Sequence, residues 1–503
     1  MSWVEASLSD RFLERVRQQP AAPALVWDGR RISYRELHAI ACGAASRLET
    51  PELADQRPVG IKAKKSPQAI ALILACLMVR RPVLLASADL GTETLRQLWA
   101  QAGISHVLTP EVGAPGGFTV ATGDVPARED GVGARPAARC DDVAVMLTTS
   151  GSTGVPKIVP LTHRAVRRFT DWASERFEIT AGTTVLNYAP LHFDLCLLDI
   201  WTTLEHGGCA TLVDQDRATD PGYLIGLIAD AEVHVVQAVP MLYQLLLHGA
   251  PDGGRPLESV VHAVVTGDSM PAGCLDALFG LLPRARLYNL YGATETNDSF
   301  IHEIDPSHDR APIPIGRPLP GVHALILSAD GRVLEGAGTG ELLVSTPFQT
   351  EGYLSEALNE GKLVVRSDDP DRRTYFRTGD IVRRDGDGVI TLEGRADSFV
   401  KVRGVRVSTQ AVERVIATHP QVVEAAVAPF SDELSGHRLH AVVRRAADSD
   451  LHSLSLRRHC ARFMDRVAIP STVEIVTTPL PKTSTGKVDR RRALPQSRAY
   501  PSG

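Results

Sequence analysis

Hydrophobic and polar positions in the first hundred residues alternate between the spacing of helices and that of strands. Ser7 to Gln19 and Tyr34 to Arg47 show the period of amphipathic helices. Ala24 to Tyr34 has the pattern of a β-hairpin that turns at Asp28-Gly29. This alternation predicts an α/β architecture. From Glu111 to Cys140 the chain is rich in Gly, Pro and Ala without sustained periodicity, which predicts a loop.

From Thr184 to Glu303, short apolar segments recur between helical ones. The predicted strands are 210–213, 233–237, 260–265 and 286–290. Strands that alternate with helices predict a second, mainly parallel sheet. From Ile315 to Leu392 the pattern changes to short strands with Gly-rich turns and few helices. That pattern is typical of a small barrel or an antiparallel sheet.

Charge and helix content rise after Arg395, which marks a separate C-terminal unit. We therefore predict an α/β protein with a large N-terminal domain, 1–395, made of two helix-flanked, mainly parallel sheets and a β-barrel-like part at about 315–392. A small α+β domain, 396–503, follows it. No period of roughly 20 to 50 residues is present, so a repeat architecture is excluded.

Composition excludes several classes of partner. The chain has 503 residues, 22% of them charged, and a formal net charge of −5, so no basic field for nucleic acid is present. No apolar run approaches the roughly 20 residues of a membrane span, and no signal pattern opens the chain, so we expect a cytoplasmic protein without a membrane partner. The seven cysteines are scattered and lack a Cys-x-x-Cys pair, which indicates neither a disulfide framework nor a zinc site.

The segment TTSGSTGVPK, from Thr148 to Lys157, combines small hydroxyl residues, glycines and one lysine. A predicted buried strand, Val143 to Leu147, precedes it, and Thr162 is expected to cap a helix from His163 towards Arg176. Backbone N–H groups and hydroxyls of such a loop converge on one point, so the pattern predicts a phosphate site for ATP. The assigned residues are Thr149, Ser150, Gly151, Ser152, Thr153, Gly154 and Lys157.

The spacing of this loop excludes a Walker A motif. That motif requires Gly-Lys followed by Ser or Thr, whereas Val155 and Pro156 precede Lys157 here and Ile158 follows it. Another class of ATP site is therefore indicated. The alternative is a flexible surface turn rich in Gly and Ser. Lysine usage argues against a turn, because the chain otherwise uses arginine for most of its cations.

Other segments complete a set of motifs. They are YNLYGATET at 288–296, YFRTGD at 375–380, GRADSFVKVRGVRV at 394–407, LPKTSTGKVDR at 480–490, and Phe193-Asp194. With the Thr148 loop they resemble, in type and order, the adenylate-forming superfamily of acyl- and aryl-CoA synthetases, luciferases and adenylation domains of nonribosomal peptide synthetases. The resemblance spans nearly the whole chain. It implies ATP and Mg²⁺ as cofactors and a mobile C-terminal lid.

The resemblance also implies roles in nucleotide binding. Tyr291, followed by Gly292, would lie on the adenine, Thr294 would reach a phosphate and Glu295 would hold Mg²⁺. Asp380 would accept both ribose hydroxyls, assisted by Arg395. Taken alone, the first motif is also compatible with a helix start capped by threonine, and Asp380 with an ordinary turn aspartate.

By the same resemblance, Lys487 is the catalytic residue. Attack of a carboxylate on the α-phosphorus concentrates negative charge, which an ammonium group stabilises. Lys482 is interpreted as structural. The lid would rotate about Asp397, and Lys401 and Gly404 would then face a pantetheine thiol.

The activated acid is predicted from the segment after Phe193. Asp194 corresponds to the aspartate that pairs with the substrate ammonium in members that activate amino acids; the alternative is a helix-start aspartate. The other substrate positions are Leu195, Leu198, Gln237, Val264, Thr266, Leu290, Asp298 and Ser299. A second carboxylate, Asp298, favours a small polar or β-amino acid, or else points away to cap the loop of Tyr291. A one-position alignment error would exchange Asp298 for Ser299.

Two departures from the family pattern indicate a divergent member. Ile158 replaces the usual glycine after Pro-Lys, and 77–82 replaces a Leu-Lys-Ala-Gly-like segment. We found neither a carrier site nor a condensation motif, so we expect a free-standing enzyme that loads a separate phosphopantetheinylated carrier protein. The alternatives are an acyl- or aryl-CoA synthetase that uses free CoA and a catalytically silent ATP-binding scaffold.

Overall fold

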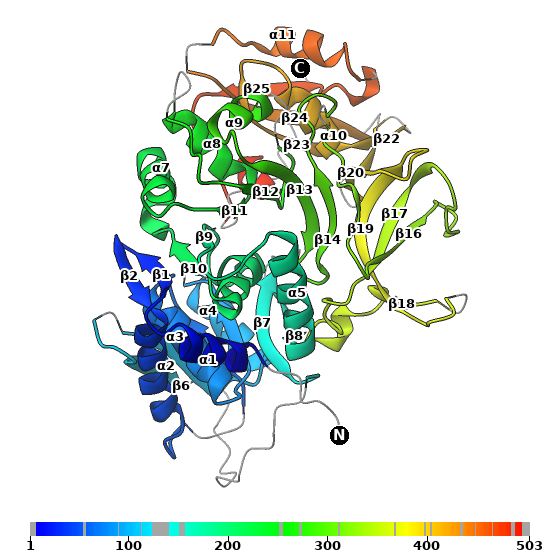
Figure 1. The fold of residues 1–503 in the computed structure, drawn as a ribbon. Helices are drawn as coiled ribbons and strands as arrows, with labels where there is room; N and C mark the ends of the chain where they lie inside the picture. The colour runs from blue at the N-terminus through cyan, green and yellow to red at the C-terminus, as the bar shows by residue number, and fades with distance from the viewer. Residues whose placement is uncertain are drawn as a thin grey trace.

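The computed structural model describes most of the chain. The described residues are 7–53, 57–88, 90–111, 113–122, 140–149, 156–250, 255–270, 274–309, 312–366, 369–396, 399–402, 405–432, 436–447, 449–464, 466–483 and 488–494. Two large sheets occupy the bottom and centre of Figure 1, an antiparallel sheet lies beside them, and the C-terminal elements form a layer across the top. The predicted α/β class with a small α+β C-terminal domain is confirmed.

The first sheet has six strands in the order β6-β5-β3-β4-β7-β8. Their bounds are β3 Val59–Lys62, β4 Val83–Ala86, β5 His106–Pro110, β6 Phe118–Thr122, β7 Val143–Thr149 and β8 Lys157–Thr162. The inner strands are parallel, and β6 and β8 join the edges antiparallel. Strand β6 corrects the predicted loop from Glu111 to Cys140, because pairing with β5 satisfies a backbone that composition alone assigned to a loop. Residues 112 and 123–139 of that segment lie outside the described residues.

Helices cover both faces of this sheet because successive side chains of a strand point to opposite sides. These helices are α2 Tyr34–Leu48, α3 Pro67–Met78 and α4 Thr92–Gln101. In β4, Val83 and Leu85 belong to the core that contains α3, whereas Leu84 and Ala86 belong to the core that contains α4. A continuous apolar run in the sequence therefore becomes a strand that is buried on both faces.

The second sheet has nine strands in the order β15-β14-β13-β12-β11-β9-β10-β1-β2. Their bounds are β1 Pro23–Trp27, β2 Arg30–Ser33, β9 Thr184–Asn187, β10 Cys209–Leu212, β11 Val235–Ala238, β12 His262–Thr266, β13 Arg286–Ala293, β14 Asn297–Glu303 and β15 Arg317–Pro318. The predicted mainly parallel sheet is confirmed, with β2, β14 and β15 as antiparallel additions. The predicted N-terminal hairpin is also confirmed, and it forms one edge of this sheet.

The helical segments of this region include the two helices predicted at Ser7–Gln19 and from His163 towards Arg176. They are α1 Leu8–Gln18, α5 His163–Arg176, the π-helix η1 Leu197–Thr202, α6 Thr203–His206, the 3₁₀ turn η2 Gln215–Arg217, α7 Pro221–Asp230, α8 Pro240–Gly249 and α9 Leu275–Leu281. Ser7 closes a capping box with Asp10, and Thr162 Oγ1 accepts a 3.1 Å hydrogen bond from the backbone N–H of Ala165. The predicted cap of α5 is therefore confirmed.

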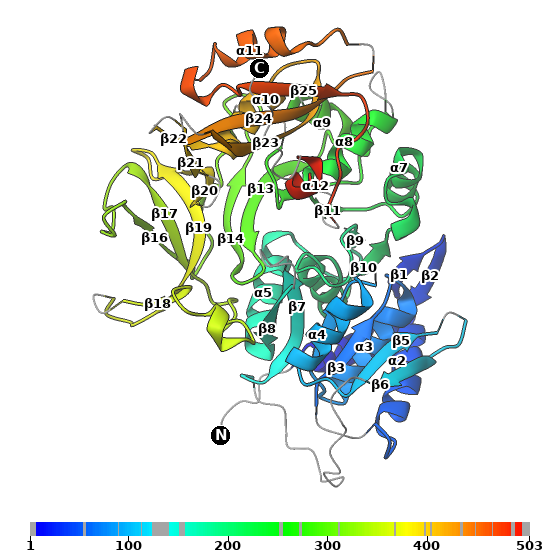
Figure 2. The same ribbon diagram turned by 180° about the vertical axis from the view of Figure 1, so that it is seen from behind.

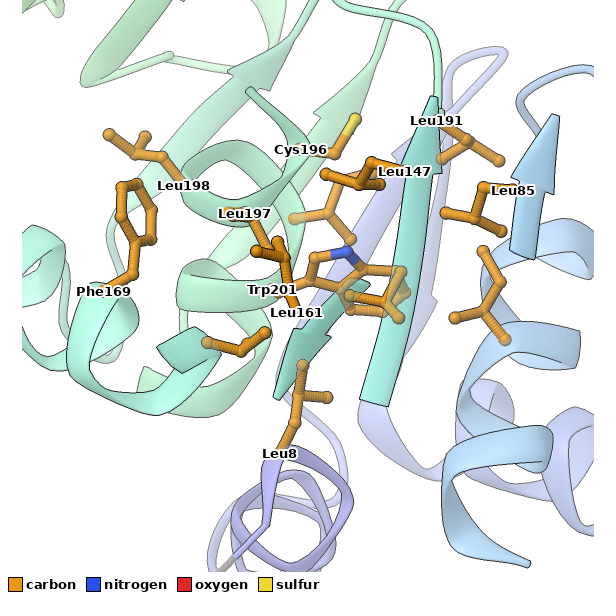
Figure 3. Close-up of a cluster of buried hydrophobic side chains, with 14 of the residues drawn as sticks. Leu8, Leu85, Leu147, Leu161, Phe169, Leu191, Cys196, Leu197, Leu198 and Trp201 are labelled. Atoms are coloured by element: carbon orange, nitrogen blue, oxygen red, sulfur yellow. The ribbon is translucent and has the colours of Figure 1, made fainter. Parts of the chain in front are cut away.

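A shared hydrophobic core joins the two sheets. Leu147 and Leu161 of the first sheet face Trp201 of η1, and Leu198 lies beside Phe169 of α5 (Figure 3). All five side chains are at most 4% exposed. This packing holds η1, and the turn that precedes it, between the two sheets.

The third sheet is antiparallel, with strands β16 His323–Leu327, β17 Gly338–Ser345, β18 Leu363–Val365, β19 Thr374–Arg384 and β20 Ile390–Arg395. Its order is β16-β17-β19-β18, and β20 pairs with β19. The 3₁₀ turn η5, Glu356–Leu358, lies before β18. The predicted region of short strands and turns is thus antiparallel sheet.

The C-terminal elements have a hydrophobic core of their own. They are β21 Phe399–Val402, β22 Val405–Ser408, α10 Thr409–Ala417, β23 Val422–Asp432, β24 Gly436–Arg445, α11 Ser453–Cys460, η7 Arg466–Ala468, β25 Thr472–Val476 and α12 Arg490–Ala493. In both views the elements from β22 to β25 lie above β13 and β20, whereas α12 lies lower (Figures 1 and 2). Arg414 of α10 donates a 2.7 Å hydrogen bond to the carbonyl of Glu393 in β20, which ties the layer to the third sheet.

Within the described ranges, no helix is long and apolar enough to cross a membrane.

Candidate active site

The parallel strands bring four of the predicted substrate positions together towards their carboxyl ends. Gln237 pairs with Asn187 on one side and with Val264 on the other, and Thr266 pairs with Leu290. Because ligands of open α/β sheets bind at this edge, the register supports a site there. The motif of Tyr291 continues from the same edge along β13.

The motif from Tyr291 forms the end of a hairpin between β13 and β14. Asn297 has φ +51°, a left-handed conformation that asparagine tolerates. A Cβ at Gly292 would overlap the carbonyl of Asn297, so only glycine fits this close approach. Thr294 and Glu295 lie half-buried in the turn. The alternative of a helix start is wrong, because the turn leads into strand β14.

The residues predicted to bind the ribose and the adenine contact each other at the carboxylate of Asp380. The hydroxyl of Tyr291 donates to Asp380 Oδ2, and Arg395 Nη1 donates to Asp380 Oδ1 at 3.1 Å. Asp380 and Arg395 are partners in the β19–β20 ladder, which explains their approach. Burial, followed by the charge of Asp380, raises the pKa of Tyr291 well above its usual value. Asp380 therefore lies within strand β19, not in an ordinary turn.

A residue that sequence reasoning missed connects the metal and phosphate positions. Tyr353 Oη donates a 2.5 Å hydrogen bond to Glu295 Oε1, and Lys157 Nζ lies 4.9 Å from the centre of the same ring. The loop of Tyr353 is tied to β8 by a 3.1 Å hydrogen bond from Leu354 N to Ile158 O. Its only sequence signal is a Gly-Tyr pair in a turn, which is too common to identify a site.

The chemistry of Glu295 fits a magnesium ion that is bound chiefly through a nucleotide. Among the described residues, no group of three His, Cys, Asp or Glu side chains lies close enough to hold a metal. Mg²⁺ commonly binds one or two carboxylates together with substrate phosphates and water, so one carboxylate near Lys157 is sufficient. Thr149 pairs with Lys157 in the β7–β8 ladder. Ser150, Gly151, Ser152, Thr153 and Gly154 lie outside the described residues.

The predicted substrate positions divide into two groups. Asp194 and Leu195 are half-buried in the turn before η1, and Asp298, opposite Gly292 in the β13–β14 ladder, is half-buried as well. Burial raises the pKa of Asp298 well above its usual value, and the charge of Asp194 raises it further. Asp194 and Asp298 are therefore close enough for the charge of one to act on the pKa of the other.

The second group is at most 5% exposed: Leu198, Gln237, Val264, Thr266, Leu290 and Ser299. Ser299 Oγ donates within its own turn, to Thr296 Oγ1 at 3.3 Å and Asn297 O at 3.2 Å. The amide of Gln237 donates to Leu195 O at 3.1 Å and to Asp199 Oδ1 at 3.3 Å. Sequence reasoning did not assign a role to Asp199, which is a carboxylate without exposed surface inside an apolar run.

The residues assigned to catalysis and to the movement of the lid are mostly outside the described ranges. This applies to Lys487, Asp397 and Gly404, whereas Lys401 is described only as a backbone position of β21. Lys482 forms a 2.5 Å ion pair with Glu424 on β23, which agrees with its interpretation as structural.

Comparison with known proteins identifies the family. The model of the AMP-binding enzyme family matches residues 12–354, and that of the AMP-binding enzyme C-terminal domain matches 411–487. The chain belongs to the AMP-binding enzyme family. It is an adenylate-forming ligase that uses ATP with Mg²⁺.

This AMP-binding enzyme is 34% identical over 353 residues to an L-proline--[L-prolyl-carrier protein] ligase of Pseudomonas fluorescens, covering 70% of the chain and 68% of the relative. It is 29% identical over 493 residues to tyrocidine synthase 3 of Brevibacillus parabrevis, covering 96% of the chain but 7% of that protein. The o-succinylbenzoate CoA synthetase MenE of Bacillus subtilis has the same fold, with a TM-score of 0.81, 20% identity and coverage of 97% of this chain and 98% of that one.

Proposed function

We propose that this AMP-binding enzyme activates an amino acid with ATP and transfers it to the pantetheine thiol of a separate carrier protein. The observation that carries the proposal is the electrostatic contact between two half-buried carboxyl groups, Asp194 in the turn before η1 and Asp298 in the β13–β14 ladder that also contains Tyr291. The names of the proline ligase and of tyrocidine synthase 3 support an amino-acid substrate.

In the first step, an oxygen of the amino-acid carboxylate attacks the α-phosphorus of ATP. The bond from that phosphorus to the bridging oxygen breaks, and pyrophosphate leaves. Asp380 and Arg395 would hold the ribose, Tyr291 the adenine, and the loop 149–154 with Lys157 the departing phosphates. Mg²⁺ would supply charge neutralisation at Glu295. Lys487 would stabilise the charge that develops on the reacting oxygens.

In the second step, the carrier thiol, after loss of its proton, attacks the acyl carbon, and AMP leaves. We assign the hinge to Asp397 and the thiol path to Lys401 and Gly404. We place the domain boundary between residues 395 and 396, just before this hinge. The C-terminal family model begins later, at residue 411, which is compatible with a linker in between. A cytoplasmic location stays a prediction.

On the acid side, Asp194 would bind the α-ammonium group. Asp298 would add a second polar contact, so we infer a small polar or a β-amino acid. The other substrate positions would shape the walls: Leu195, Leu198, Gln237, Val264, Thr266, Leu290 and Ser299. The alternative acceptor is free CoA, which the fold of MenE leaves open.

Amino-acid-dependent exchange of pyrophosphate into ATP tests the first step. We expect exchange with a narrow set of amino acids, and its loss in Lys487→Ala; exchange that survives this change contradicts the role of Lys487. Product analysis with CoA or with purified holo carrier protein identifies the acceptor. Nucleotide binding without exchange across amino and carboxylic acids would favour the silent scaffold.

A further inference from the structure

The carboxylate of Asp199 is held between two amides from neighbouring strands. Asn187 Nδ2 donates to Oδ2 at 3.1 Å, and Gln237 Nε2 donates to Oδ1 at 3.3 Å. Asn187 ends β9 and is the register partner of Gln237 in β11. Each strand thus supplies one amide to one oxygen. All three side chains are at most 1% exposed, so these contacts do not compete with bulk water.

The same amide of Gln237 also reaches the turn that carries Asp194. Its Nε2 donates to the carbonyl of Leu195 at 3.1 Å. That carbonyl also accepts the N–H of Leu198 at 3.2 Å and of Asp199 at 3.1 Å. Leu195 follows Asp194 directly, and the carbonyl of Asp194 accepts the N–H of Leu197 at 2.8 Å. The backbone of the turn is therefore fixed to β11 through one side chain.

A buried lysine provides the positive charge for this region. Lys65 is 3% exposed, and its Nζ donates to the carbonyls of Asn187 and Tyr188 at 2.8 and 3.0 Å. Burial lowers the pKa of Lys65 to about 8, and Cys196, Asp199 and Asp214 oppose this effect. Burial also raises the pKa of Asp199 well above its usual value, which Asn187, Lys65 and Gln237 oppose.

Burying a charged group or an amide costs free energy compared with apolar packing. The presence of such groups on the otherwise apolar strands β9 and β11 therefore indicates a role beyond stability. We propose that Asn187, Asp199 and Gln237 form a positioning network that fixes the turn of Asp194 and thereby sets the recognition of the substrate ammonium group. The inference rests on the proposed function, because it gives Asp194 that role. Gln237, assigned above to the walls of the substrate site, is then also a positioning residue, because it acts on Asp194 through Leu195.

Loss of this network is expected to affect the amino acid and not ATP. Loosening the turn weakens the contact between Asp194 and the substrate ammonium group, which raises the KM for the amino acid; a displacement of about 1 Å can cost about 100-fold. The nucleotide contacts of Asp380 and Glu295 are on other elements, so the KM for ATP is expected to stay within about twofold.

The test compares Gln237→Met, which keeps the volume and removes both hydrogen bonds, with Gln19→Met. Gln19 Nε2 donates to the carbonyl of Gly207 at 2.8 Å, away from the site, and serves as the matched control. We expect Gln237→Met to raise the amino-acid KM about 10- to 100-fold and to lower the preference for the amino acid over its hydroxy-acid analogue by a similar factor. Gln19→Met should change neither.

Asp199→Asn, which keeps the shape, is the second variant if Gln237→Met does not fold, and it should shift the same ratio in the same direction. An unchanged amino-acid KM in a folded variant, or an equal rise in the KM for ATP, overturns the network. If the wild-type chain exchanges with no amino acid, the proposed function fails instead. If Asp194→Ala loses the amino-acid preference and both network variants keep it, only the network fails.

Discussion

The nucleotide side and the amino-acid side of the site hold their carboxylates differently. Asp380 and Glu295 accept hydrogen bonds from tyrosines, Tyr291 and Tyr353, and Asp380 is also paired with Arg395. Asp199, on the amino-acid side, is wholly buried, and it accepts from the amides of Asn187 in β9 and Gln237 in β11. On the predicted nucleotide side the carboxylates thus accept from side-chain hydroxyls, whereas Asp199 accepts from Gln237, which also donates to the turn of Leu195.

The largest effect is expected at Asp380. Two charge-assisted hydrogen bonds to a ribose, at about 2 kcal/mol each, correspond to about 1000-fold in kcat/KM for ATP. Asp380→Ala should show this loss with every accepted amino acid, measured by pyrophosphate exchange. Asp371→Ala, an exposed aspartate paired with Arg373, is the control. A loss of kcat/KM that differs from one amino acid to another would contradict independent binding of nucleotide and amino acid.

Asp194→Ala tests the opposite side. Loss of one ammonium–carboxylate contact, about 2–3 kcal/mol, should lower kcat/KM for the amino acid about 100-fold. The KM for ATP should stay nearly unchanged, and a hydroxy-acid analogue should be affected little. An equal loss with the analogue would contradict ammonium binding by Asp194.

Tyr353→Phe is expected to have a moderate effect on the nucleotide side. It keeps the ring near Lys157 and removes one hydrogen bond to Glu295, about 1 kcal/mol. The concentration of Mg²⁺ required for half-maximal binding of ATP, measured by calorimetry without amino acid, should change about fivefold. Tyr375→Phe, which removes a hydroxyl contact with Asp369, is the matched control. An unchanged Mg²⁺ requirement in Tyr353→Phe would show that the hydrogen bond from Tyr353 does not orient Glu295 for metal binding.

Glu205 provides a buried carboxylate for comparison with Asp199. Burial raises its pKa from 4.5 to about 7, with Thr170 and Arg11 opposing the rise. The folded protein then retains a proton that the unfolded chain loses, so stability falls as pH rises from about 4.5 to about 7. Glu205→Gln should raise the stability at pH 8 by about 1–3 kcal/mol and have little effect at pH 4, measured by denaturant unfolding.

The KM values of Glu205→Gln should equal those of the wild type, because Glu205 contacts Thr170 of α5 and not the turn of Asp194. A changed amino-acid KM would mean that any disturbance of the η1–α6 segment reaches the site. That result would show that positioning of the turn of Asp194 is not specific to Asp199.

The sequence predicted those elements whose signals are local. Capping residues such as Ser7 and Thr162 act within one helical turn, and the Asp28-Gly29 hairpin is specified by its own turn residues. The family motifs were also legible, since Tyr291 and Asp380 lie in short segments of characteristic spacing. By contrast, β6 was missed because its stability comes from pairing with β5, which composition does not record.

Contacts between distant segments were decided only by the tertiary structure. Tyr353 meets Glu295, 58 residues away, and Gln237 meets Asp199, 38 residues away, because the packing of loops and of η1 against the sheets brings them together. The sequence by itself thus determined the α/β class and the family motifs, whereas the roles of the nucleotide residues stay predictions. Folding decided that Gln237 donates to Leu195 and that Asp199 receives two amides, since a hydrogen bond depends on distances that no linear spacing specifies.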